Sequence, residues 1–104
     1  MSVALQIPTG EDSPCRLVPI ATEAVYAAEW LPVADSLRTK WLQRFQVGAE
    51  FDRAEAAEIV SEFTIASERF AADGKAHLAA RADAVIEALR DAVANCLSAT
   101  FFIG

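Results

Sequence analysis

Residues 52–74 read DRAEAAEIVSEFTIASERFAADG and carry the clearest helical pattern in the chain. Asp52 is followed three residues later by Glu55, which is the spacing of a capping box at a helix N-terminus. Asp73 and Gly74 supply a stop signal, because glycine adopts the left-handed conformation that ends many helices. Between these ends, apolar residues recur at spacings of three and four and share one helix face: Ala56, Ile59, Phe63, Ala66 and Phe70. We therefore predict an amphipathic helix that begins after Asp52 and buries its phenylalanines.

A second long helix is predicted directly after this one, over residues 75–97. Its apolar positions repeat like the a and d positions of a coiled coil, and they are Leu78, Ala82, Val85, Leu89, Ala92 and Cys96. Because the connection at Asp73 and Gly74 is short, we expect the two helices to pack as antiparallel neighbours.

The preceding region also has helical spacing, from the candidate N-cap Thr22 to the candidate stop signal Gly48. One apolar stripe consists of Tyr26, Trp30, Val33 or Ala34, Leu37, Trp41 and Phe45. Pro32 interrupts this stripe, since proline is tolerated in the first turn of a helix but clashes inside one. We expect either a kink, or a short helix that ends near Trp30 followed by a new helix that starts at Pro32.

The two ends of the chain carry strand-like patterns. Residues 3–7 and 15–20 are short apolar runs separated by a stretch rich in turn formers, which favours a β-hairpin. Pro19 would confine the second run to a sheet edge, so an arm lying across the helices is the competing interpretation. The apolar residues 100–103 either pair as a strand with this hairpin or pack back on the helices.

The 104 residues are expected to form one domain, because a chain of this length encloses a single core. The predicted fold class is mainly α: a compact antiparallel bundle of three to four helices, with a short N-terminal β-hairpin and a C-terminal extended segment as optional additions. Within the single helical domain 1–104, we expect an extended arm or hairpin over 1–21, helices over 22–97 and a C-terminal extended segment over 98–104.

No targeting or membrane segment is expected. The first ten residues contain no lysine, no arginine and no apolar run long enough for a signal peptide. No apolar stretch approaches the roughly 18 residues of a membrane span. We therefore expect a cytoplasmic protein. Cys15 and Cys96 are far apart in the sequence, and we interpret both as free thiols, with Cys96 buried and Cys15 in a loop.

The chain is acidic, with 9 lysine and arginine residues against 15 aspartate and glutamate residues and a formal net charge of -6. This charge repels phosphate backbones and argues against nucleic acid as a partner. Residues 49–74 carry seven acidic side chains against two arginines. On a helix, Glu55, Glu58 and Glu62 fall within about 60° of one another and form an acidic row.

An acidic row with apolar neighbours suits protein binding, because charge steers association and apolar residues supply affinity. The predicted partner-binding residues are Phe51, Glu55, Glu58, Glu62 and Ile65. The alternative is a solvated helix face, part of which is neutralised by Arg38, Lys40 or Arg44 from the preceding segment.

The residues that catalysis and metal binding usually require are scarce. His77 is the only histidine, and no serine has the G-x-S-x-G context of a hydrolase nucleophile. Gly74 stands where the glutamate of a Glu-x-x-His metal motif would be. We therefore predict no catalytic residue, no metal site and no cofactor. Trp30 and Trp41 are expected in the core, with an apolar ligand pocket or exposed partner anchors as alternatives.

These features predict a small, non-enzymatic, acidic protein that binds another protein, with a basic partner favoured. In size and charge class the chain resembles bacterial immunity proteins and antitoxins, and this resemblance implies the inhibition of a toxin. One alternative is a secretion- or assembly-associated helical hairpin similar to the WXG family, although residues 71–74 lack the Trp-x-Gly turn of that family. Another is a small-molecule-sensing regulatory bundle. A homodimer is compatible with each of these functions.

Overall fold

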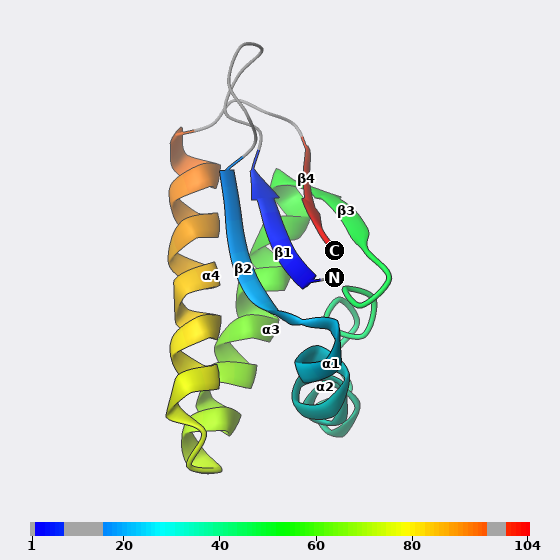
Figure 1. Ribbon diagram of the computed structural model, residues 1–104. Coiled ribbons are helices and arrows are strands. Elements are labelled where there is room, and N and C mark those ends of the chain that lie inside the picture. Colours follow the sequence, from blue (N-terminus) through cyan, green and yellow to red (C-terminus); the bar gives the residue numbers. More distant parts are fainter. Residues whose placement is uncertain (1, 8–15, 96–99) are drawn as a thin grey trace.

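The protein has an α+β fold in which a four-stranded antiparallel sheet is covered on one face by two long helices (Figure 1). The computed structural model describes residues 2–7, 16–95 and 100–104. The prediction of a mainly α helical bundle is wrong. Short segments at both ends of the chain, and a third just before the first long helix, pair into the sheet. These pairings join residues far apart in the sequence, so helical periodicity does not reveal them.

The sheet has the strand order β2-β1-β4-β3, and every neighbouring pair is antiparallel. Strands β1 (Ser2–Ile7) and β2 (Arg16–Thr22) confirm the hairpin interpretation of the N-terminal region. Strand β4 (Thr100–Ile103) lies between β1 and β3 (Ala49–Asp52). The C-terminal segment therefore pairs with the hairpin and does not pack back on the helices. Pro19 lies in the edge strand β2, where a missing N–H donor is tolerated.

Side chains alternate across the sheet because successive residues of a strand point to opposite faces. Apolar side chains of the inward face are buried, among them Leu5, Ile7, Phe51, Phe101 and Ile103. On the outward face, the half-buried Phe102 lies against two glycines. A Cβ atom added to Gly48 or Gly104 would lie 2.7 Å from the Phe102 ring. Gly48 also has a φ of 104°, so the entry to β3 requires glycine.

Helices α3 (Arg53–Ala72) and α4 (Ala76–Asn95) confirm the two long helices predicted from the sequence. Asp52 and Glu55 form the predicted capping box, in which each side chain accepts a hydrogen bond from the other residue's backbone N–H, at 2.8 and 3.1 Å. Gly74, with a φ of 76°, follows the end of α3. The predicted apolar face of α3 is buried throughout: Ala56, Ile59, Phe63, Ala66 and Phe70.

The predicted seam of α4 is also buried, at Leu78, Ala82, Val85, Leu89 and Ala92. Cys96, the last member of that seam, lies outside the described residues, as do Cys15 and the turn-forming residues 8–14. The interpretation of both cysteines as free thiols stays a prediction.

The region before β3 contains one helical segment, which is shorter than predicted. It consists of α1 (Glu23–Val25), a π-helical turn η1 (Tyr26–Trp30) and α2 (Leu31–Ser36), and Thr22 is its N-cap as expected. The π-helical turn lies just before Pro32, whose ring would crowd the preceding turn of a regular α-helix and which has no N–H to donate. The chain thus passes Pro32 without a break in the helical segment.

This helical segment ends at Ser36, so the prediction of a helical stripe that reaches Phe45 is wrong. Arg38 adopts a φ of 55°. The N–H groups of Arg38 and Thr39 donate to carbonyls of the last helical turn at 3.2 and 3.0 Å. This arrangement is a Schellman motif in which arginine occupies the position that glycine usually takes.

Residues 37–48 form an irregular loop that still contributes large side chains to the core. Trp41 and Phe45 are almost completely buried. The ring centroid of Trp41 lies 6.2 Å from that of Phe51, and Phe45 stacks on Phe63 at 6.1 Å. Burial therefore explains why these positions are apolar, although their backbone is not helical.

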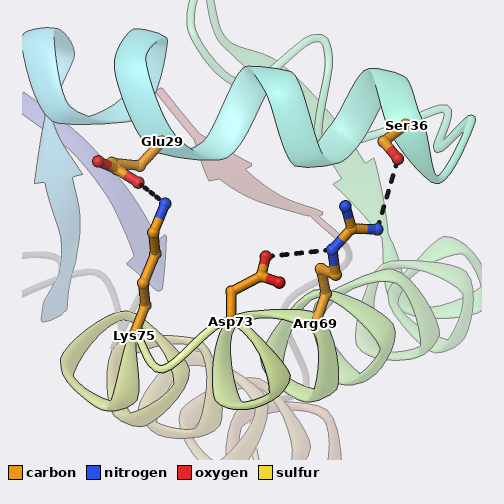
Figure 2. A network of polar contacts seen from close by, with 5 residues as sticks. All are labelled: Glu29, Ser36, Arg69, Asp73 and Lys75. Carbon is orange, nitrogen blue, oxygen red and sulfur yellow. Dashed lines mark hydrogen bonds and ion pairs between the residues drawn. The ribbon is translucent and has the colours of Figure 1, made fainter.

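Surface polar contacts connect the first helical segment to the turn between α3 and α4 (Figure 2). Lys75 pairs with Glu29 at 2.5 Å. Arg69 pairs with Asp73 at 3.1 Å and donates to Ser36 at 3.4 Å. Because the paired side chains are between 35% and 42% exposed, each ion pair contributes only about 0–1 kcal/mol. These contacts hold the helical segment against the end of α3, whereas the stability of the fold comes mainly from the apolar core.

Candidate functional site

Two carboxylates of the predicted acidic row bind a loop of the same chain. Glu62 accepts hydrogen bonds from the backbone N–H groups of Lys40, Trp41 and Leu42 at 3.1, 2.9 and 3.0 Å. Glu58 accepts a hydrogen bond from the indole N–H of Trp41 at 3.1 Å. The row therefore anchors the loop 37–48 to α3.

Tyr26 also binds this loop. Its buried hydroxyl donates to the Leu42 carbonyl at 2.5 Å, so side chains bind both the N–H and the C=O of Leu42. Burial, and secondarily the charge of Glu62, raises the pKa of the Tyr26 hydroxyl well above its usual value. The hydroxyl consequently remains a hydrogen-bond donor at pH values where an exposed tyrosine ionises.

The basic residues of this loop contact an aromatic ring. Lys40 Nζ lies 5.2 Å and Arg44 Cζ 5.7 Å from the centroid of the Trp41 ring, within the range of cation–π attraction. In the described part of the chain, neither cation forms an ion pair with Glu58 or Glu62. The neutralisation considered from the sequence is thus replaced by hydrogen bonds from backbone and indole N–H groups.

The other predicted partner-binding residues are divided between the core and the surface. Phe51 is 1% exposed, so the prediction that it projects outward is wrong. It lies in β3, where alternation turns it inward, and its ring is 5.7 Å from that of Phe101. Ile65 is 46% exposed on α3, while Glu55 belongs to the capping box. The structure therefore does not bring the predicted set together on one free face.

Trp30 and Trp41 both lie in the core, as the first of the interpretations drawn from the sequence expects. Trp30 is fully buried and stacks on Tyr26. Its ring also meets Phe63 and Phe70 edge-on, at 5.7 and 4.8 Å. Both tryptophans consequently serve as packing residues of an aromatic cluster.

A separate surface feature is an open groove along the seam between α3 and α4. Its first part has a volume of about 410 Å³ and is lined by Arg53, Ala56, Ala57, Val60, Arg90, Val93 and Ala94. On α3, the direction of Arg53, Ala57 and Val60 is about 100° away from that of the core-facing side chains. This part of the groove therefore opens away from the sheet.

The groove continues along the same seam into a second hollow of about 450 Å³, lined by Thr64, Asp83, Ile86, Glu87 and Arg90. Arg90 borders both hollows. The lining positions recur at helical intervals of three and four, at 53, 57, 60 and 64 on α3 and at 83, 87, 90 and 94 on α4. We call the two hollows together the α3–α4 groove; its length on α3 is about 16 Å at a rise of 1.5 Å per residue.

The two ends of the α3–α4 groove carry opposite charges. Arg53 borders one end and Asp83 borders the other, while Arg90 and Glu87 lie between them on α4. Arg53 Nη2 donates to the Val93 carbonyl at 2.6 Å, which fixes its guanidinium over the last turn of α4. Asp83 accepts a hydrogen bond from a serine of α3 at 2.6 Å.

Arg90 and Glu87, the other two charges of the groove, have no polar contact among the described residues. Over residues 2–7, 16–95 and 100–104, Arg90 and Glu87 form neither a hydrogen bond nor an ion pair, and both are exposed. A partner that binds the groove can therefore pair with them without breaking a polar contact to any described residue.

The floor of the α3–α4 groove is apolar, and Val60, Ile86 and Val93 are its largest side chains. This surface is not among the residues predicted from the sequence, because helical periodicity marks only the stripe that faces the core. The available signal was these three aliphatic residues, which lie beside that stripe on each helix. Which of them meet across the seam depends on the relative register of the helices, which the sequence does not specify.

Comparisons of the chain with known protein families, with curated proteins and with solved structures find no match. Among the described residues, no helix is both long enough and apolar enough to span a membrane. Over the same residues, no three His, Cys, Asp or Glu side chains are grouped so that they could hold a metal ion.

Proposed function

We propose that this chain is a non-enzymatic protein-interaction protein, and that it binds another polypeptide through the α3–α4 groove. The observation that carries this proposal is an apolar groove about 16 Å long whose two ends carry opposite charges. An apolar centre with a charged border is the usual anatomy of a protein interface.

The shape of the groove favours a polypeptide over a small molecule. Small-molecule sites enclose most of their ligand, whereas the α3–α4 groove is open along the helix seam. On α3, the exposed Ala57 lines the groove, and the exposed Ala54 and Ser61 are its neighbours on the helix surface, at i−3 and i+4. Small residues such as these allow a helix of the partner to approach closely.

The proposed function is of the class expected from the sequence, but the proposed binding surface is the α3–α4 groove and not the acidic row. Glu58 and Glu62 hold the loop 37–48, so we do not base the proposal on the acidic row. A toxin-neutralising role, as in an immunity protein or antitoxin, stays a prediction. The groove itself does not require a basic partner, because it is lined by two arginines and two carboxylates.

Site-specific photo-cross-linking in the native cell tests the proposal. The photoreactive residue p-benzoylphenylalanine replaces Ala57 in the groove, or the exposed Ala28 of η1 as the control. We expect Ala57 to capture one defined protein that Ala28 does not capture, and we expect Val60→Lys to abolish the capture while the circular dichroism spectrum is retained. No adduct at Ala57, or the same adducts from both positions, would contradict the proposal.

A further inference from the structure

We propose that the occupant of the α3–α4 groove is the same groove of a second copy of this chain, in a two-fold dimer that pairs Arg90 with Glu87 and Arg53 with Asp83. This inference rests on the proposed function, because it names the partner of the same surface. It follows from the order and spacing of the charges along the seam.

The charges are spaced symmetrically about one point of α4. The midpoint between Glu87 and Arg90 lies between Ala88 and Leu89. Asp83 lies about 8 Å from this point in one direction, and Val93, whose carbonyl binds Arg53, lies about 7 Å from it in the other, at 1.5 Å per residue. Each positive charge therefore has a negative counterpart at nearly the same distance on the other side.

A two-fold axis through this point places each positive charge of one copy opposite a negative charge of the other. In a two-fold interface, the same surface patch is used by both subunits, and each contact occurs twice. With the axis in the plane of the interface and perpendicular to the helices, α4 runs antiparallel to α4 of the second copy. Arg90 of each copy then faces Glu87 of the other, and Arg53 of each faces Asp83 of the other.

The sizes of the side chains along the two helices fit this arrangement. Beside the groove, α3 carries small exposed side chains, which allow the two copies of α3 to approach closely. The rim of α4 carries the long side chains of Glu87 and Arg90, which can fill the hollow of the second copy. The axis crosses α4 between Ile86 and Val93, so apolar floor residues lie on both sides of it. Glu87 and Arg90 on the rim of α4 lie nearest to the axis, and Asp83 and Arg53 lie farther from it.

The net charge of the chain makes this pairing selective. Two chains of charge -6 repel one another, so association requires a face on which opposite charges meet. The α3–α4 groove is such a face, whereas the exposed acidic residues elsewhere disfavour contacts in other orientations.

Sedimentation velocity over a concentration series, up to about 1 mM as the limit of weak specific binding, tests the dimer. We expect the unmodified chain to dimerise and Arg90→Glu to weaken dimerisation by at least about tenfold, because it places like charges opposite each other twice. Glu87→Arg should have the same effect. Arg81→Glu is the matched control: this exposed arginine of α4 borders a different hollow, beside His77, and should leave dimerisation unchanged.

A mixture of the two single variants separates specific pairing from loss of folding. R90E and E87R chains should associate with each other more strongly than either does with itself, and the double variant with both changes should recover self-association. A monomer throughout the concentration range would overturn the dimer, and so would a dimer that none of these reversals weakens. If the chain is monomeric and Ala57 cross-links to a different protein, the proposed function stands and the dimer is refuted.

Discussion

Replacement of Glu62 should detach the loop 37–48 and cost a large part of the stability. The carboxylate accepts three backbone N–H groups, and the two from Trp41 and Leu42 are partly buried. A buried donor that loses its partner costs about 1–3 kcal/mol, while the more exposed Lys40 N–H can turn to water. We therefore expect Glu62→Ala to lower the free energy of unfolding by about 2–4 kcal/mol.

The conservative variant refines this expectation. Glu62→Gln retains an oxygen in the position that accepts from Trp41 and Leu42, but its amide group faces the Lys40 N–H. We expect a smaller loss of about 1 kcal/mol, since the charge contribution to the hydrogen bonds disappears. Glu68, an exposed glutamate of the same helix, is the control, and Glu68→Ala should change stability by less than about 0.5 kcal/mol.

Urea unfolding followed by circular dichroism provides the free energies, provided that the denaturant slopes of the variants agree. Amide hydrogen exchange gives a local readout, because the N–H groups of Trp41 and Leu42 should lose protection in Glu62→Ala and not in Glu68→Ala. Equal midpoints for both alanine variants, or unchanged protection at Trp41 and Leu42, would refute the anchoring role of Glu62.

Three further predictions concern the core and the helix ends. Tyr26 is the only tyrosine, and because its pKa is raised in the folded protein, the stability it contributes is complete below pH about 10 and is lost as the pH rises further. Tyrosinate absorbance should therefore appear only together with unfolding, and its appearance in the folded protein would contradict this prediction. Phe63→Ala should destabilise by about 3–5 kcal/mol, because this fully buried ring contacts Trp30 and Phe45; a negligible shift of the urea midpoint would contradict that packing. Arg38→Gly should raise the free energy of unfolding by about 0.5–1 kcal/mol, because glycine adopts a φ of 55° without strain. A lower melting temperature of this variant would contradict the prediction, since it would show that the arginine side chain stabilises the fold by more than its backbone conformation destabilises it.

The sequence predicted those elements whose signals are local. The capping box at Asp52 and the stop at Gly74 delimit α3, and its period of 3.6 residues shows which side faces the core. The N-terminal hairpin was similarly accessible, because its apolar runs flank a stretch rich in turn formers. These signals required no knowledge of distant contacts.

The failures involve long-range contacts. Strand β3 has only four residues, and its last residue, Asp52, is also the N-cap of α3. No local signal therefore distinguishes this strand from an irregular segment that leads into the helix. The loop 37–48 keeps helical spacing because Trp41 and Phe45 are buried, while its path depends on Glu62 some twenty residues away. The α3–α4 groove, in turn, depends on the register between two helices.

Isotope-filtered nuclear Overhauser spectroscopy on a mixture of labelled and unlabelled chains tests the groove interface most directly. We expect intermolecular contacts from the methyl groups of Val60, Ile86 and Val93, which form the groove floor. Intermolecular contacts confined to exposed residues of other faces, such as Leu17 and Ile65, or no intermolecular contact in concentrated samples, would contradict it.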